Sequence, residues 1–475
     1  MEYGCEILAH KIKEFIDFKN INLYLYNKKY LLGIFMKIIY QIFSIKKEEI
    51  FPLVCATLFI FLLFYSYGML RPIRDSLGIS NFKDSLKWLF LGTFIATIFA
   101  SLVMMALSSF VKKKNYFWFI YGFFACNLLG FYFAFSIINT DSSAFKILAS
   151  VFYIWVSVFS LFIISIAWSL IADIFSKERS IRLFGIITAG ASLGAICGAF
   201  SIGFLSQFFS TKTFILFSFF LLLCAIFVKQ LLLYFASNLF SVEENLIFHN
   251  RLNHPVGSKN PLSGVSLIFK SKYLLAIVVF ILLLSSVSTF LYMEQARVIK
   301  ENFHTIEARA SAFGYLDLIV QSFSLIIQIF LTSKIAKFLG LKPLLSLLGF
   351  IVCIGFIVLI FSHPAFLPLA IVMSIRRIGE YAFIKPAREM LFVPLMPDEK
   401  YKVKNFLDTV VYRGGDAASA QVEGLAARVS IDFALLVGAI ISFIWGSVGF
   451  YLAKKYQNKI SDNNLSYNLD KVSKE

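Results

Sequence analysis

Residues 51–75 read FPLVCATLFIFLLFYSYGMLRPIRD, and this stretch limits the class of fold that the chain can adopt. Residues 51–70 contain no Asp, Glu, Lys or Arg, whereas Arg71, Arg74 and Asp75 follow directly. About 20 apolar residues in a helix bridge the ~30 Å hydrocarbon core of a bilayer. The stretch therefore predicts a transmembrane helix with ionisable side chains at one end.

The composition of the whole chain agrees with this pattern. Of 475 residues, 59% are apolar and only 15% are charged, and the mean hydropathy is +0.78. A soluble domain has about a quarter of its residues charged. The composition therefore excludes a soluble enzyme, a disordered regulator and a secreted disulfide scaffold, and it predicts an all-α polytopic membrane protein in a lipid bilayer. We attribute the net charge of +17 to cytoplasmic loops rather than to nucleic-acid binding.

Apolar runs long enough to cross a bilayer recur twelve times along the chain. The eleventh run is the least apolar, since it contains Asp408, Arg413, Asp416 and Glu423, and we expect it to face a watery interior. The twelve predicted spans lie near residues 51–70, 88–110, 116–138, 145–172, 183–206, 214–236, 273–293, 312–332, 341–361, 365–384, 405–427 and 434–453.

Basic clusters fall on alternate loops between these spans, and the positive-inside rule places such loops in the cytoplasm. Both termini are therefore predicted to be cytoplasmic. The basic segments RPIRDSLG (71–78) and EQARVIKENFH (294–304) lie on the other side and are not explained by topology. The cytoplasmic clusters are Lys28, Lys29, Lys46 and Lys47; Lys112 to Lys114; Ser176 to Arg182; residues 237–272; Lys334, Lys337 and Lys342; Lys400, Lys402 and Lys404; and Lys454, Lys455 and Lys459.

The polar stretch 237–272 separates six predicted spans from six others. We expect a cytoplasmic segment 1–50 with an interfacial helix near 30–44, a six-helix half 51–236, a cytoplasmic linker 237–272, a six-helix half 273–453 and a cytoplasmic tail 454–475. The halves resemble each other weakly at an offset near 222, which sets Arg74 against Arg297 and Gly194 against Gly415. Two six-helix repeats are typical of secondary transporters whose substrate site lies between the halves.

Motifs for catalysis are absent from the sequence. It contains no Walker A, HExxH or GxSxG pattern, and its six cysteines and five histidines form no cluster, so we expect neither an enzyme, a metal site nor a cofactor. Without a nucleotide-binding cassette, transport would depend on a gradient or on exchange.

Ionisable residues inside or beside the spans are therefore the candidates for a site, because each is costly in a membrane unless it meets a cavity or a partner. Several arginines near helix ends suit a multivalent anion, since Arg donates two parallel hydrogen bonds to phosphate. The alternative is that these residues pair with one another to close gates. The residues are Arg71, Arg74, Asp75, Asp173, Glu294, Arg297, Asp317, Arg376, Arg377, Glu380, Lys385, Arg388, Glu389, Asp408, Arg413 and Asp416.

A glycine series, Gly190, Gly194, Gly198 and Gly203, occupies the fifth predicted span. Close helix packing is its expected role, with a phosphate cradle as the alternative. Tyr153, Trp155 and Trp168 in the fourth span can stack on a purine or contact lipid and core side chains.

Three segments resemble a known family: YGMLRPIRDSLG (67–78), ADIFSKERSIRLFGIITAGASLGA (172–195) and KPAREMLFVPLMPDEKYKVKNFLDTVVYRGGDAAS (385–419). They are similar to the bacterial nucleotide exchange transporters of the ATP/ADP translocase type, whose architecture is like that of the major facilitator superfamily. The resemblance extends over roughly residues 50–455 and implies twelve helices in the inner membrane and nucleotide counter-exchange without hydrolysis. The residues that it assigns to family motifs are Arg71, Arg74, Asp75, Lys385, Arg388, Glu389, Lys404, Asp408, Arg413 and Asp416. With Glu294 and Arg297, these are the predicted substrate-binding or gating residues.

Two other functions fit the sequence. One is a transporter of the same fold for an organic anion, a peptide or a drug-like compound. The other is a membrane scaffold or sensor, but that function requires a soluble output domain, and the polar segments 1–45, 237–272 and 454–475 are short for one. The expected partners are a nucleotide such as ATP or ADP and the bilayer, without nucleic acid.

The topology can be tested by cysteine labelling in a cysteine-free background. A cysteine at position 141 or 304 is expected to react with an impermeant reagent added from outside, because the twelve-span topology places both loops on the outer side. A cysteine at position 256, in the linker, is expected to be protected. The reverse labelling pattern would contradict the twelve-span topology.

Overall fold

The computed structural model describes residues 46–80, 85–110, 113–175, 177–239, 268, 271–330, 340–392, 403–404 and 406–472. The predicted interfacial helix at 30–44 and most of the linker 237–272 lie outside the described residues, as do Lys28, Lys29, Lys112, Lys334, Lys337, Lys400 and Lys402.

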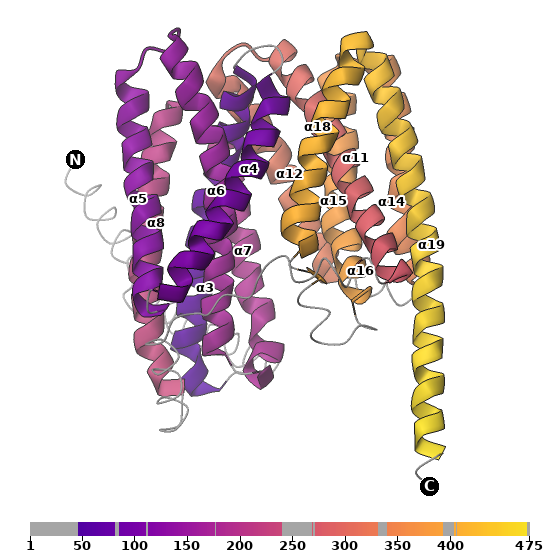
Figure 1. Ribbon diagram of the computed structural model, residues 1–475. Coiled ribbons are helices and arrows are strands. Elements are labelled where there is room, and N and C mark those ends of the chain that lie inside the picture. Colours follow the sequence, from indigo (N-terminus) through magenta and orange to yellow (C-terminus); the bar gives the residue numbers. More distant parts are fainter. Residues whose placement is uncertain are drawn as a thin grey trace, which may run out of the picture.

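The described residues form helices gathered into two bundles that stand side by side (Figure 1). This confirms the all-α membrane fold. The first bundle contains α3 (Ile50–Ser80), α4 (Ser85–Phe110), α5 (Lys113–Ile137), α6 (Ser143–Ile174), α7 (Lys177–Leu205) and α8 (Thr211–Ala236). The second contains α11 (Lys272–Asn302), α12 (Ile306–Phe330), α14 (Leu341–Ser362), α15 (Phe366–Gly379), η4 (Glu380–Ile384), α16 (Lys385–Met390), η5 (Leu407–Val411), α18 (Tyr412–Val429) and α19 (Ile431–Val472).

Each predicted span corresponds to a helix in these bundles, but two of the helices are irregular. Ten helices of the described chain are long and apolar enough to cross a membrane. The tenth and eleventh predicted spans correspond to α15–η4–α16 and η5–α18, and η4 and η5 are π-helical turns. Such turns are rare and often occur at functional sites. These two helices are also more polar than the other spans. Their charged residues include several that line the cavity between the bundles.

The last helix is longer than its predicted span. The predicted span ends at residue 453, whereas α19 contains 42 residues and continues to Val472. At 1.5 Å per residue it is about 63 Å long, roughly twice the thickness of the hydrocarbon core. In Figure 1 its final part, coloured yellow, projects beyond the bundle.

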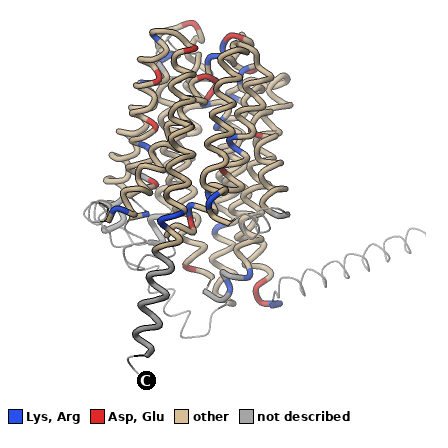
Figure 2. Tube along the Cα trace, turned by 90° about the vertical axis from the view of Figure 1, so that its right-hand side faces the viewer, with Lys and Arg blue, Asp and Glu red and all other residues tan. Residues whose placement is uncertain are grey.

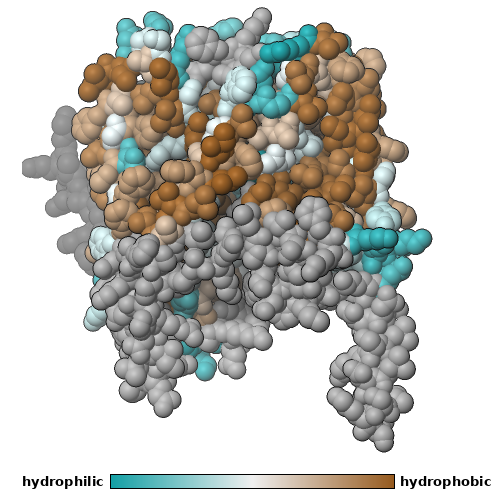
Figure 3. All heavy atoms as spheres, viewed as in Figure 1, coloured by the Kyte–Doolittle hydropathy of each residue, from teal (hydrophilic) through white to brown (hydrophobic). Residues whose placement is uncertain are grey.

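The surface of the molecule suits lipid rather than water. Large apolar side chains such as Phe99, Phe227 and Phe361 are exposed, and hydrophobic residues cover much of the face drawn in Figure 3. Charged residues gather near both ends, and some also lie along the middle of the bundles (Figure 2). We call the end with the turns 138–142, 206–210 and 303–305 the short-loop end, and the end from which α19 projects the termini end.

Two helix contacts in the first bundle have counterparts in the second. Helix α3 packs against α7 and α8, and α11 packs against α18 and α19. Gly194 of α7 lies directly against the backbone of Phe61, and Gly415 of α18 lies against Leu282 and Ser285 of α11. The two glycines that the sequence offset aligns therefore occupy corresponding helix contacts. Between the bundles, α7 contacts α12 and α4 contacts α18.

The glycine series of α7 brings two helix backbones together. A Cβ atom at Gly198 would lie 2.7 Å from the carbonyl oxygen of Tyr65 and 2.7 Å from the carbonyl carbon of Gly68 in α3. A Cβ atom at Gly190 would lie 2.7 Å from the carbonyl oxygen of Thr57. This close approach supports the packing role rather than a phosphate cradle.

Replacing Gly198 with alanine is expected to force α3 and α7 apart. Overpacking at a tight contact costs about 1–3 kcal/mol, so the Gly198→Ala variant should unfold at a lower temperature in detergent. The matched control is Gly130→Ala, because Gly130 of α5 has no atom within 4 Å of the added methyl group. Equal melting temperatures of the two variants would contradict the proposed packing role.

Candidate functional site

A cavity of about 330 Å³ lies between the two bundles. From the first bundle it is lined by α3, α4 and α6, and from the second by α11, the α15–η4–α16 helix and the η5–α18 helix. We call it the central cavity. Its volume lies at the lower end of the range for small-molecule sites. Its lining residues are Tyr67, Arg71, Arg74, Phe90, Thr93, Tyr153, Ser157, Leu161, Ser288, Thr289, Tyr292, Arg376, Arg377, Glu380, Tyr381, Lys385, Asp408, Tyr412, Arg413 and Asp416.

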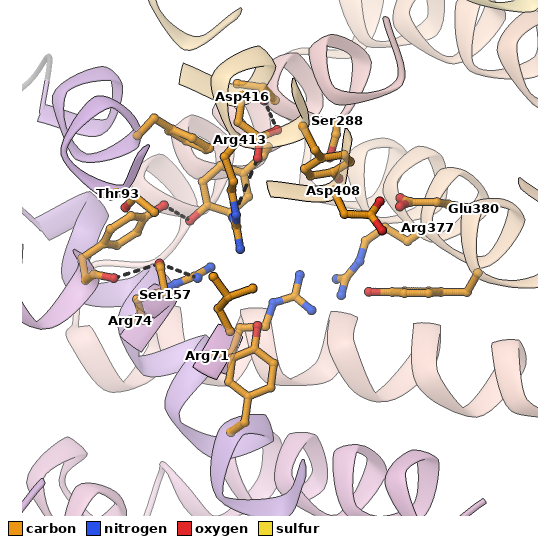
Figure 4. A pocket seen from close by; sticks show the side chains of 18 of the residues that line it. Arg71, Arg74, Thr93, Ser157, Ser288, Arg377, Glu380, Asp408, Arg413 and Asp416 are labelled. Carbon is orange, nitrogen blue, oxygen red and sulfur yellow. Dashed lines mark hydrogen bonds and ion pairs between the residues drawn. The ribbon is translucent and has the colours of Figure 1, made fainter. Parts of the chain in front are cut away.

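The lining of the central cavity is basic. Figure 4 shows the side chains of Arg71, Arg377 and Arg413 directed toward a common space. Six lining side chains are cationic and three are anionic, which gives an excess of positive charge at the cavity wall. The cations are Arg71, Arg74, Arg376, Arg377, Lys385 and Arg413, and the anions are Glu380, Asp408 and Asp416.

Most of these cations also have a carboxylate neighbour. Arg74 donates to Asp75 at 2.6 Å, and Arg388 pairs with Asp408 at 3.0 Å. Of the other lining cations, Arg376 pairs with Glu380, and Arg413 pairs with Asp416 at 3.8 Å. Arg388 and Lys404, which pairs with Glu389 at 2.6 Å, lie outside the lining. Ion pairing, the alternative to substrate binding, is therefore present. The paired arginines Arg74, Arg376 and Arg413 still line the cavity.

Asp317 of α12 connects the two bundles. Its Oδ1 atom lies 2.6 Å from Nη1 of Arg377 on α15, and its Oδ2 atom lies 3.8 Å from Nε of Arg71 on α3. The sequence singled out Asp317 and Arg377 only as ionisable residues within spans. Their contact could not be derived from sequence spacing, because α3, α12 and α15 are far apart in the chain.

Two buried arginines beside the cavity have unused donors. Arg376 and Arg377 are 4% and 5% exposed. Within the described part of the chain, Nε of Arg376 and Nη2 of Arg377 have no hydrogen-bond partner. A buried donor without a partner is destabilising, so an anion that reached these atoms would gain the corresponding free energy.

Aromatic side chains form much of the remaining wall. The Arg74 guanidinium lies 5.0 Å from the ring centre of Tyr153, and the Lys385 ammonium lies 4.1 Å from that of Tyr381. Tyr292 of α11 donates to Asp75 of α3 at 2.8 Å, which is a second polar link between the bundles. The lining tyrosines other than Tyr153 were missed by the sequence analysis, because nothing distinguishes them among the 21 tyrosines of the chain.

The structure brings only part of the predicted set to the cavity. Arg71, Arg74, Lys385, Asp408, Arg413 and Asp416 line it, and Asp75 and Arg388 contact lining residues. Glu389 and Lys404 form a partly exposed pair outside the lining. Trp155 lies among Phe124, Phe131, Phe152 and Phe159, and Trp168 contacts Phe184, so both pack in the first bundle.

Glu294 and Arg297 belong to a separate buried cluster. Arg297 bridges Glu294 of its own helix, at 2.9 Å, and Glu423 of α18. Nδ1 of His363 lies 2.6 Å from the other oxygen of Glu294. Both glutamates are almost fully buried, and all members of the cluster lie in the second bundle. Arg297 therefore connects helices within one half rather than lining the cavity.

Residues that could ligate a metal are not grouped in the described ranges, where no three His, Cys, Asp or Glu side chains come together. The cavity wall offers charge-assisted hydrogen bonds and aromatic surfaces instead.

Two bundles of membrane-spanning helices around a central polar cavity define a membrane transport protein. The sequence profile of the Major Facilitator Superfamily matches residues 53–384, and the chain belongs to this superfamily.

Solved transporter structures show the same fold at low sequence identity. The peptide transporter POT, as a point mutant, has a TM-score of 0.58 at 12% identity, and the match covers 85% of this chain and 95% of that one. The inward-open xylose transporter XylE from E. coli has a TM-score of 0.55 at 12% identity, covering 85% and 94%. A point mutant of the nucleoside transporter NupG has a TM-score of 0.53 at 13% identity, covering 86% and 99%.

One curated relative matches a short segment. ADP,ATP carrier protein 2 of Chlamydia pneumoniae is 30% identical over 89 residues, which are 18% of this chain and 16% of that protein. The match thus spans less than a fifth of either chain.

A substitution can separate the buried cluster from the cavity. The Arg297→Gln variant leaves Glu294 and Glu423 without their shared cation, and breaking a buried pair costs about 3–5 kcal/mol. We therefore expect a large loss of thermal stability in detergent. The control is Lys454→Gln, which removes an exposed cation of α19 outside this cluster. A stable Arg297→Gln protein with weakened substrate binding would instead place Arg297 in the substrate site.

Proposed function

We propose that the protein exchanges nucleotides, such as ATP for ADP, across the bacterial inner membrane by alternating access and without hydrolysis. The observation that carries this proposal is the excess of cationic side chains around a cavity between the two halves. The short match to an ADP,ATP carrier protein agrees with it.

Phosphate chemistry accounts for the residue types at the cavity wall. The arginine guanidinium stays charged at any physiological pH and binds phosphate oxygens through two parallel donors. Arg71 and Arg74 approach from the first bundle, and Arg377 and Arg413 approach from the second. A polyphosphate chain can therefore accept hydrogen bonds from both halves at once, which suits a carrier that moves its halves around a fixed substrate.

The aromatic side chains suit the base of a nucleotide. Tyr67, Phe90, Tyr292 and Tyr412 line the same cavity as the arginines. An aromatic ring stacks on the π-face of a base with about 1–3 kcal/mol per base. The wall thus combines groups for both ends of a nucleotide.

The described hydrogen bonds between the bundles lie around the cavity and toward the short-loop end. Ser76 donates to the carbonyl oxygen of Ile306 at 2.6 Å, and Ser311 donates to that of Gly203 at 2.6 Å. The Gln421 side chain donates to the carbonyl oxygen of Lys87 at 3.0 Å. These contacts close the short-loop end. With the proposed cytoplasmic termini, the closed short-loop end would lie on the outer side of the membrane.

A transporter of another organic anion is the second candidate, because the same basic wall would bind it. A drug-like cation is disfavoured, since cations outnumber anions in the lining. The structural neighbours, at 12–13% identity, share the fold and do not distinguish these substrates.

Exchange in proteoliposomes tests the proposal. Uptake of labelled ATP is expected to require unlabelled nucleotide inside and to proceed equally with a non-hydrolysable analogue. Uptake that requires hydrolysis, or the absence of any nucleotide exchange, would contradict it.

The same assay, run with ATP, ADP and AMP, tests direct phosphate contact. Losing one charge-assisted contact is expected to weaken the apparent affinity of the Arg74→Gln variant ~10–100-fold for ATP and less for AMP. Arg74→Lys should recover part of the loss, and Arg428→Gln, on the exposed end of α18, is the matched control. An equal loss for all three nucleotides would contradict phosphate recognition by Arg74.

A further inference from the structure

Asp317 occupies an unusual position beside the central cavity. It is 7% exposed and lies between Arg377 of its own half and Arg71 of the other half. The Arg71–Asp317 ion pair joins the two halves. Both arginines line the cavity, whereas Asp317 does not.

The two arginines form a site for an anion, and the carboxylate of Asp317 uses only part of their hydrogen-bond donors. The Asp317 carboxylate comes no closer to Arg71 than 3.8 Å. Arg377 is only 5% exposed, and its Nη2 atom has no hydrogen-bond partner. A carboxylate has two oxygens, whereas a phosphate group has three or four, so a phosphate can use donors that Asp317 leaves unpaired. An anion entering the cavity would thus compete with Asp317 for the same two cations.

We propose that Asp317 is an internal counter-ion that occupies the anion site formed by Arg71 and Arg377 in the empty carrier and is displaced by the substrate anion. The inference rests on the proposed anion-binding role of the cavity, but not on which anion is carried. Asp317 lowers the apparent affinity for the anion, because binding includes the cost of its displacement. In return, it prevents the buried guanidinium of Arg377 and the partly buried one of Arg71 from remaining without an anion.

Displacement of Asp317 also affects the contact between the halves. When the substrate takes Arg71 from Asp317, the ion pair between α3 and α12 is broken while the substrate connects the halves. The empty carrier, in contrast, is held together by Asp317. Asp317 therefore does not contact the substrate. It sets the apparent affinity for the anion and links anion binding to the contact between the two halves.

Pyrophosphate binding to the purified full-length chain in detergent tests this proposal, because it needs no nucleotide and no transport. Removing the competing carboxylate in Asp317→Asn is expected to tighten the apparent pyrophosphate affinity at least ~10-fold. The matched control is Asp432→Asn, which removes an exposed carboxylate of α19 outside the cavity lining and should change affinity less than about 3-fold. Adding Arg377→Gln to Asp317→Asn should cancel the gain.

If Asp317→Asn folds poorly, pyrophosphate itself provides the second measurement. An external anion should then replace the missing carboxylate, so that pyrophosphate raises the melting temperature and yield of this variant more than those of the unmodified protein. An unchanged or weaker affinity in the folded variant, or a variant that pyrophosphate does not rescue, would overturn the proposal. Failure of nucleotide exchange together with the expected pyrophosphate results would instead contradict only the nucleotide substrate.

Discussion

The rest of the structure depends on the scarcity of water within a bilayer, because an ionisable side chain there needs a charged partner or a polar cavity. Two groups of described residues illustrate how the chain satisfies this constraint. Around the central cavity, Arg71 and Arg377 share Asp317 between the two halves. Within the second half, Arg297 is shared by Glu294 and Glu423. The first arrangement can respond to a ligand, whereas the second stabilises one bundle.

The position of the polar links explains how one cavity can serve two sides of a membrane. Backbone contact at the glycine series, including Gly198 against α3, makes the first half a compact unit. Contacts between the halves include polar links, such as Tyr292 with Asp75 and Ser76 with Ile306, and an apolar cluster in which Ile79 packs against Ile299 and Phe313. Hydrogen bonds of this kind can break and re-form without disturbing either core. Two compact halves that can move relative to each other around a central site are what alternating access requires.

Several residues of the candidate site could be predicted from the sequence, but which of the charged residues line the cavity could not. Arg71, Arg74 and Arg413 were found because charges at the end of, or within, an apolar run are exceptional. Glu294 and Arg297 gave the same signal, yet they lie in the separate cluster. The face of α11 on which they lie places them in that cluster. Because α11 is apolar on nearly all sides, the sequence does not reveal which face points to the cavity. The cavity tyrosines gave no signal.

By itself, the sequence determined that the chain is an all-α membrane protein with twelve helices, since the length and hydropathy of each run follow from the thickness of the bilayer. It also determined that charges such as Arg74 and Asp416 must be sheltered from lipid. Only the tertiary structure decided which charges meet. Arg71, Asp317 and Arg377 come from three helices that are distant in sequence, and their contact depends on how the two bundles are packed against each other. No local pattern encodes that arrangement, because it results from side-chain packing over the whole interface between α3, α12 and α15.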